Sequence, residues 1–166
     1  MNTILPAIRS YSVVVMALFL LGSLAMSCKN KGGTDPDIDP REQYVGRYEG
    51  GMSSALNVGG FEGVTQTGSA TTVITNAPNP KEMYVEVTSS LGRPTPLKLT
   101  AELTDKGFAV IDRKTDQMNV LGKVVEGNFT ATGVLAGKDL AITITTEGLS
   151  TGAPVKRNES VTGTKK

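Results

Sequence analysis

The chain has 166 residues, with 17 Lys and Arg against 16 Asp and Glu, and it contains no histidine, no tryptophan and a single cysteine. This length suits one domain, and the balanced charge argues against nucleic-acid binding, which needs a basic excess on one face. Without histidine the chain lacks the usual base for nucleophilic catalysis and the commonest transition-metal ligand. A carboxylate pair or a Ser-Lys dyad remains possible, but no spacing indicates either, so we expect no enzyme, no metal and no cofactor.

An apolar N-terminal segment precedes the cysteine. Residues 13–26 are mostly apolar and follow one basic residue, Arg9. The segment has the length of a secretory signal and falls short of the roughly 20 apolar residues that span a bilayer. A lone cysteine in an exported chain has no intramolecular partner, so it is either a free thiol or a modified one. We therefore predict a signal peptide over residues 1–27 and favour modification at Cys28.

The residues around Cys28 resemble the lipobox of bacterial lipoproteins. Leu24, Ala25, Met26 and Ser27 precede the cysteine, and polar sequence follows it at once. The resemblance implies that Cys28 is the lipidation site, carrying acyl chains such as palmitate, and that the mature protein is anchored to a membrane of the cell envelope. No acidic cluster directly follows Cys28, which favours the periplasmic side of the outer membrane over surface display.

Residues 28–42 are predicted to be the lipidated cysteine and a flexible tether. Small polar residues are followed by Asp35-Pro36-Asp37-Ile38-Asp39-Pro40, which can continue neither a helix nor a sheet. The alternating acids resemble the start of an EF-hand loop, but the loop glycine and the closing glutamate are missing, so we favour a solvated linker. The folded domain is then expected over residues 43–166.

From Tyr44 onward, apolar and polar residues alternate with a period of two, which is typical of half-buried strands. Residues 97–104 alternate without an error. Turn signals with Gly, Pro or Asn recur about every ten residues, among them residues 112–116 and 126–128, and leave connections too short for parallel crossovers. We predict antiparallel strands near residues 43–53, 67–76, 81–89, 96–104, 107–113, 118–125, 128–136, 139–147 and 155–164.

A meander of this many strands either closes into a barrel or splits into two packed sheets. Closure removes exposed edges, and short hairpins place each strand beside its predecessor. We therefore predict an all-β fold, a single antiparallel up-and-down barrel of about eight strands. A β-sandwich is the alternative, with crossing connections in the longer loops at residues 57–66 or 149–154.

Three segments carry a family resemblance: Tyr44-Val45-Gly46-Arg47-Tyr48-Glu49-Gly50, the Gly-, Thr- and aliphatic-rich run over residues 122–144, and the closing residues 161–166. Their layout resembles the calycin-like, or lipocalin-like, β-barrel lipoproteins of Bacteroides and its relatives. The resemblance implies an eight-stranded barrel of lipocalin type over residues 43–166, and it implies no established activity. From the residues themselves, Tyr44 and Tyr48 share one strand face with Gly46 and Gly50, so the rings can plug one end of a barrel.

The inward faces of the predicted strands are apolar and show no charged residue, so a ligand held inside would be oily. The function predicted is a non-catalytic binding module for a small hydrophobic molecule, with the membrane as a further partner through the lipid and any protein partner left open. The alternative is a scaffold, interaction or inhibitor protein that has a filled core and acts through its loops, where Phe61 stands among glycines. The candidate ligand-binding residues are Phe61, Met83, Val85, Leu99, Phe108, Phe129 and Ile142.

Overall fold

The computed structural model describes residues 39–91 and 96–166, and these residues contain strands and turns but no helix. The predicted signal peptide and Cys28 lie outside the described residues. The ten strands are β1 (Gly46–Val58), β2 (Phe61–Glu62), β3 (Gln66–Asn76), β4 (Glu82–Ser89), β5 (Leu97–Thr104), β6 (Gly107–Val110), β7 (Thr115–Val120), β8 (Lys123–Ala136), β9 (Asp139–Ser150) and β10 (Ala153–Lys165).

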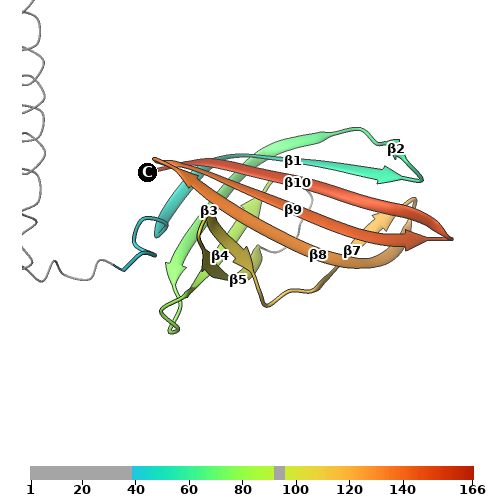
Figure 1. The fold of residues 1–166 in the computed structure, drawn as a ribbon. Helices are drawn as coiled ribbons and strands as arrows, with labels where there is room; N and C mark the ends of the chain where they lie inside the picture. The colour runs from blue at the N-terminus through green and yellow to red at the C-terminus, as the bar shows by residue number, and fades with distance from the viewer. Residues whose placement is uncertain (1–38, 92–95) are drawn as a thin grey trace, which may run out of the picture. The chain divides into compact units, whose positions relative to one another are not determined.

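The sheet closes on itself into an antiparallel barrel (Figure 1). Neighbours follow in the order β1, β3, β4, β5, β6, β8, β9 and β10, and β10 pairs again with β1 from Tyr48↔Lys165 to Val58↔Val155. The two remaining strands are additions at its margin, since β2 pairs with β1 and β7 pairs with β8. The predicted fold class, a single eight-stranded barrel, is confirmed, and the sandwich alternative is not adopted.

One predicted strand and one predicted turn were wrong. The run predicted as a strand over residues 118–125 is a hairpin, in which Leu121 and Gly122 form the turn with φ angles of 50° and 81°. The turn expected at residues 126–128 is part of β8 instead. Gly127 serves close strand approach there, because a Cβ at this position would lie 2.7 Å from the carbonyl oxygen of Glu147 on β9.

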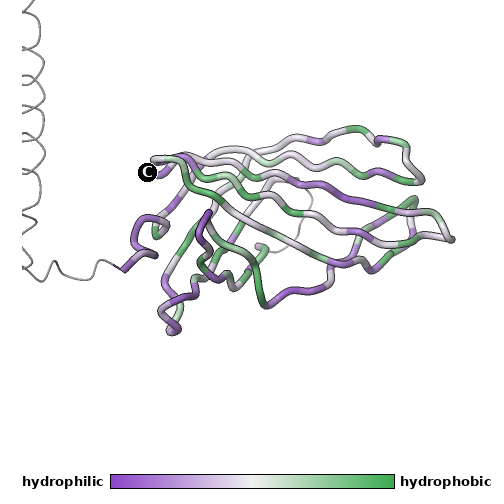
Figure 2. The backbone as a smooth tube through the Cα atoms, viewed as in Figure 1, coloured by the Kyte–Doolittle hydropathy of each residue, from purple (hydrophilic) through white to green (hydrophobic). Residues whose placement is uncertain are grey.

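Side chains fill the interior of the barrel. Most inward-pointing residues of the strands form one apolar cluster, and hydrophobic and polar residues alternate along the chain (Figure 2). Tyr44 was expected on the first strand but lies in the turn before β1; Tyr44 and Tyr48 are both buried, and the Tyr48 hydroxyl donates to the Tyr44 carbonyl oxygen at 2.7 Å. The Tyr44 ring meets the edge of Phe108 with 5.9 Å between ring centroids. Desolvation raises the pKa of the Tyr48 phenol.

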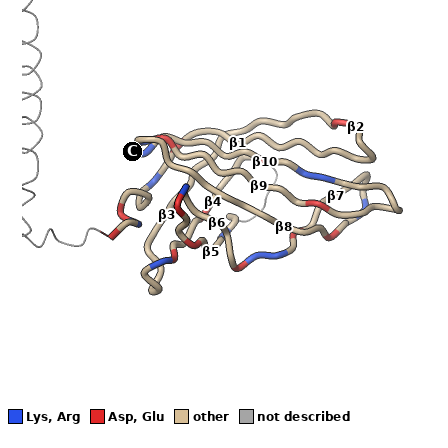
Figure 3. Tube along the Cα trace, in the orientation of Figure 1, with Lys and Arg blue, Asp and Glu red and all other residues tan. Residues whose placement is uncertain are grey.

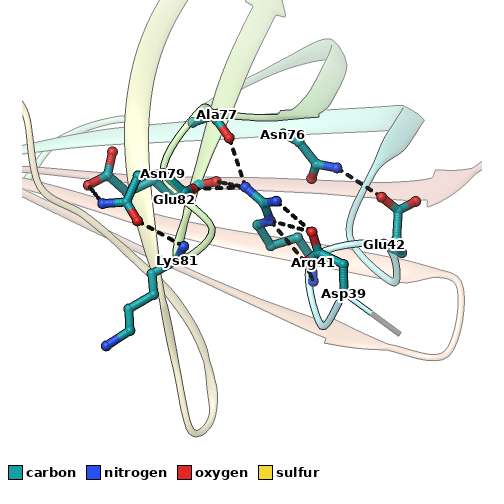
Figure 4. Close-up of polar contacts among 8 residues, drawn as sticks. All are labelled: Asp39, Arg41, Glu42, Asn76, Ala77, Asn79, Lys81 and Glu82. Atoms are coloured by element: carbon teal, nitrogen blue, oxygen red, sulfur yellow. Dashed lines mark hydrogen bonds and ion pairs between the residues drawn. The ribbon is translucent and has the colours of Figure 1, made fainter. Parts of the chain in front are cut away.

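The short N-terminal stretch before β1 is bound to the barrel through Arg41, as Figure 4 shows. The buried Arg41 guanidinium donates to the carbonyl oxygens of Ala77 and Asn79, each at 2.8 Å, and pairs with the Asp39 carboxylate at 2.5 Å. Hydrogen bonds from Arg41 hold the pKa of the Asp39 carboxyl below its ordinary value. The structure thus places the last residues of the predicted tether, 39–42, against the loop between β3 and β4.

The two ends of the barrel differ because its strands differ in length. β1, β8, β9 and β10 have 12 to 14 residues each, whereas β4 and β5 have 8 and β6 has 4. At the N-terminal end, where β1 begins, β1 pairs with β3 from Gly46↔Ile74 and with β10 from Tyr48↔Lys165. At the other end, called here the open end, the long strands extend past the short ones (Figure 1) and enclose a second, small apolar cluster built on Met118, Val120 and Val155.

A candidate binding cleft at the open end

A cleft of about 420 Å³ lies where the short strands stop. Pairing of β3 with β4 begins only at Ala70↔Ser89, so residues 66–69 of β3 have no β4 partner in the ladder. β6 joins β8 through just two residue pairs, which leaves the outer part of β8 to β7. The cleft occupies this interrupted part of the wall, and the residues lining it are Ser54, Leu56, Val64, Gln66, Leu91, Gln117, Met118, Asn119, Arg157 and Glu159.

The wall of the cleft is mixed in character. Gln66 and Asn119 present side-chain amides, which can both donate and accept hydrogen bonds. Leu56 and Val64 supply apolar surface. Such a wall suits an amphipathic ligand, because apolar contact gives affinity and a few polar groups fix orientation.

A buried ion network underlies the cleft. Arg157 of β10 is 16% exposed and pairs with two carboxylates, Asp116 of β7 and Glu159 of β10, which are 7% and 4% exposed. Its Nε atom lies 3.3 Å from Glu159 Oε2. Arg113 also pairs with Asp116, at 2.6 Å. Residues of opposite charge lie on neighbouring segments near β7, β9 and β10 (Figure 3). The ion pairs between their side chains offset the cost of taking the charges out of water.

This network corrects the prediction that no charge interrupts the inward faces. Along β10, Val155, Arg157, Glu159 and Val161 follow one another at alternate positions, so the two charged residues share the inward face with the two valines. Asp116 was predicted to lie in a turn but is a buried residue of β7. The sequence signal that could have revealed the network is the alternation within residues 155–161, which places two charged residues on the same strand face as two valines.

The structure separates the predicted ligand-binding residues from the cleft. Six of them are buried in the main apolar cluster and none lines the cleft: Met83, Val85, Leu99, Phe108, Phe129 and Ile142. The seventh, Phe61, is 82% exposed on β2, where it pairs with Val58. The sequence interpretation therefore missed the whole cleft lining.

No model of a known protein family matches the chain, and no curated protein has a significantly similar sequence. Within residues 39–91 and 96–166, no group of three or more acidic, cysteine or histidine side chains is arranged to hold a metal ion. The same described residues include no helix with the length and hydrophobicity that crossing a bilayer requires.

Proposed function

We propose that the protein is a calycin-like lipoprotein of the bacterial cell envelope that acts as a non-catalytic binding module. Cys28 would carry the lipid and hold the protein at the periplasmic side of the outer membrane. The ligand would occupy the open-end cleft rather than the interior of the barrel. The apolar run before Cys28, the lone thiol and the barrel fold support this proposal together.

One observation favours the cleft over the barrel interior as the site of binding. The interior positions that a lipocalin-like carrier would use are buried against one another, and Tyr48 and Phe108 are among the largest fully buried side chains. A ligand there would have to displace packed side chains, which is costly in a protein interior. The open-end cleft needs no such displacement and has polar groups along its wall. The ligand proposed is therefore small and amphipathic rather than purely oily.

The first described residue, Asp39, lies at the end of the barrel away from the cleft. Asp39, where the described chain begins, lies beside the loop between β3 and β4 at the N-terminal end of the barrel. The cleft lies at the other end of β1, beside Leu56. Attachment through the residues before Asp39 would thus join the barrel at the end remote from the cleft.

Native mass spectrometry of the lipoprotein released from membranes in mild detergent tests the proposal. We expect a co-purifying small molecule in the wild type and its loss in Gln66→Arg, which places a larger charged group at an exposed position of the cleft wall. Thr143→Arg, on the exposed outer face of β9, is the matched control and should retain the molecule. A ligand that survives Gln66→Arg, or a wild type that is always empty, would contradict binding in the cleft.

A second candidate function, interaction through the loops, is favoured by apolar side chains at the open end. Phe61 lies on β2, and Leu121, in the β7–β8 turn, is 94% exposed in a left-handed conformation that disfavours leucine. A protein partner would bury these side chains. Its recovery from solubilised envelopes should then fall with Phe61→Ala, whereas an unchanged yield would count against a role of this residue.

A further inference from the structure

Two charged residues line the open-end cleft, and both are already paired. They are Arg157 and Glu159, and Arg157 Nε lies 3.3 Å from Glu159 Oε2. The other guanidinium nitrogens of Arg157 donate to the Gln117 carbonyl oxygen at 3.1 Å and to the Asp116 carboxylate. A ligand in the cleft therefore meets no unpaired charge on the described residues that line it.

The ion network as a whole is neutral. Arg113 and Arg157 contribute two positive charges, and Asp116 and Glu159 contribute two negative ones. An ionic ligand held against this network would bring a charge that has no counter-charge, or it would have to take a partner from an existing pair. Either event costs free energy, because a charge removed from water needs a partner. The network therefore disfavours both anionic and cationic ligands.

Uncharged hydrogen-bonding groups lie beside the network. The pairing of β1 with β3 and β10 places Gln66, Ser54 and Glu159 in one row across the three strands. Within the described part of the chain, the side chains of Ser54 and Gln66 have no hydrogen-bond partner. A serine hydroxyl and a glutamine amide can each donate and accept hydrogen bonds. The hydroxyl groups of a ligand can do the same, so a hydroxyl-bearing head suits both side chains.

The cleft becomes apolar towards the end of β1. Leu56 and Val58 follow Ser54 at alternate positions of this strand, so the three side chains share one face. Leu56 lines the cleft together with Val64, which is 89% exposed. Beyond them, the exposed Phe61 pairs with Val58, the last residue of β1. An apolar chain can therefore lie along this surface and point towards the open end.

We infer that the cleft binds an uncharged amphiphile, with a hydroxyl-bearing head against Ser54 and Gln66 and an apolar chain along Leu56 and Val64. The inference rests on the proposed function, since it names the ligand class of the same site. The cleft volume of about 420 Å³ lies near the lower end of the range for small-molecule pockets, so the head is one sugar or a polyol of similar size. A fatty acid or an alkylamine with the same chain is disfavoured by its charge.

Three probes that share a hexyl chain test the charge of the head. Hexyl glucoside is uncharged, whereas hexanoate and hexylammonium carry opposite charges at neutral pH. Each probe is titrated into the full-length lipoprotein in nanodiscs, and the methyl NMR signals of Leu56 and Val64 report binding in the cleft. Empty nanodiscs correct for partitioning into lipid. We expect the dissociation constant of hexyl glucoside to be at least about tenfold below that of either ion. A charged probe that binds as tightly as the glucoside would overturn the inference.

A change of charge at Gln66 tests the position of the head. Gln66→Glu places a carboxylate without a partner at an exposed position of the cleft wall, so hexylammonium should bind about threefold tighter than to wild type, and hexanoate should bind more weakly. Thr143→Glu, on the outer face of β9, is the matched control and should change neither affinity. Ser54→Ala should weaken only the glucoside, whereas Val64→Ser should weaken all three probes alike. The same ranking and affinities in Gln66→Glu as in wild type would overturn the position of the head.

The inference and the proposed function fail separately. If a charged probe binds most tightly and its binding is lost with Gln66→Arg, the cleft is a binding site and the uncharged head is wrong. If hexyl glucoside binds equally well to wild type and to Gln66→Arg, the cleft is not the site and the proposed function fails. If no probe gives saturable shifts at Leu56 and Val64, the ligand class is wrong, and the co-purifying molecule still decides the proposed function.

Discussion

The seam between β6 and β8 gives the sharpest test of barrel closure. The seam has two residue pairs, Phe108↔Gly133 and Ala109↔Thr132. The Phe108 ring lies directly over Gly133, where an added Cβ would come within 2.0 Å of Cζ and within 2.5 Å of both Cε atoms. Gly133→Ala must therefore push a buried ring out of its place. Overpacking of this kind costs about 1–3 kcal/mol, and we expect a value at the upper end.

The same contact predicts a rescue. Leucine lacks the three ring atoms that would clash, so Gly133→Ala should cost less than about 1 kcal/mol in a Phe108→Leu background. Phe108→Leu alone should cost about 1–2 kcal/mol through lost apolar contact. Urea unfolding followed by far-UV circular dichroism measures all four proteins, with Thr132→Ala on the exposed outer face as the control. Additive effects, with no coupling between the two sites, would refute the packing of Phe108 on Gly133.

Three further predictions concern stability. Tyr48→Phe should lower the free energy of unfolding by about 1 kcal/mol in urea titrations, because the Tyr44 carbonyl loses its buried donor; an unchanged midpoint would contradict that bond. The pKa of Asp39 is lower in the folded chain than in the unfolded one. The ion pair with Arg41 therefore stabilises the folded state fully above about pH 4, and this stabilisation is lost as the pH falls through the lowered pKa of Asp39. The difference in free energy of unfolding between wild type and Asp39→Asn should therefore shrink as the pH is lowered. A difference that does not change with pH would argue against the pair. Asp116→Ala should lower the free energy of unfolding, measured in thermal or urea unfolding, by less than the value of about 3–5 kcal/mol that is typical of breaking an isolated buried pair, because Arg157 loses one of its two carboxylates but keeps Glu159; a neutral effect would show that the network is solvated.

The barrel was predictable because its strands bury one face only. Residues 97–104 alternate strictly, and β5 occupies Leu97–Thr104. The errors arose where glycine has more than one use. Gly122 looked like part of a strand but forms a turn together with Leu121, a residue that turn chemistry does not favour. Gly127 looked like a turn but lies within β8, where it allows close approach to β9.

The cleft was not predictable from local patterns. It exists because β4, β5 and β6 are shorter than β1 and β8, and strand length depends on pairing between distant segments. The ion network is also non-local, since Asp116 and Arg157 lie on different strands and are 41 residues apart. The prediction of an apolar interior holds for the main cluster but fails on β10, where Arg157 and Glu159 face inward. Sequence alone could not distinguish a filled barrel from a hollow one.

A filled interior is the claim on which the placement of the binding site depends, and xenon binding tests it most directly. Xenon enters dry apolar cavities, so methyl NMR spectra of the detergent-solubilised chain under xenon pressure report any hollow core. We predict no saturable shifts for the methyl groups of Val85, Leu99 and Ile142, which are packed in the main cluster. Saturable shifts at these three residues would show an open lumen and contradict a binding site confined to the cleft.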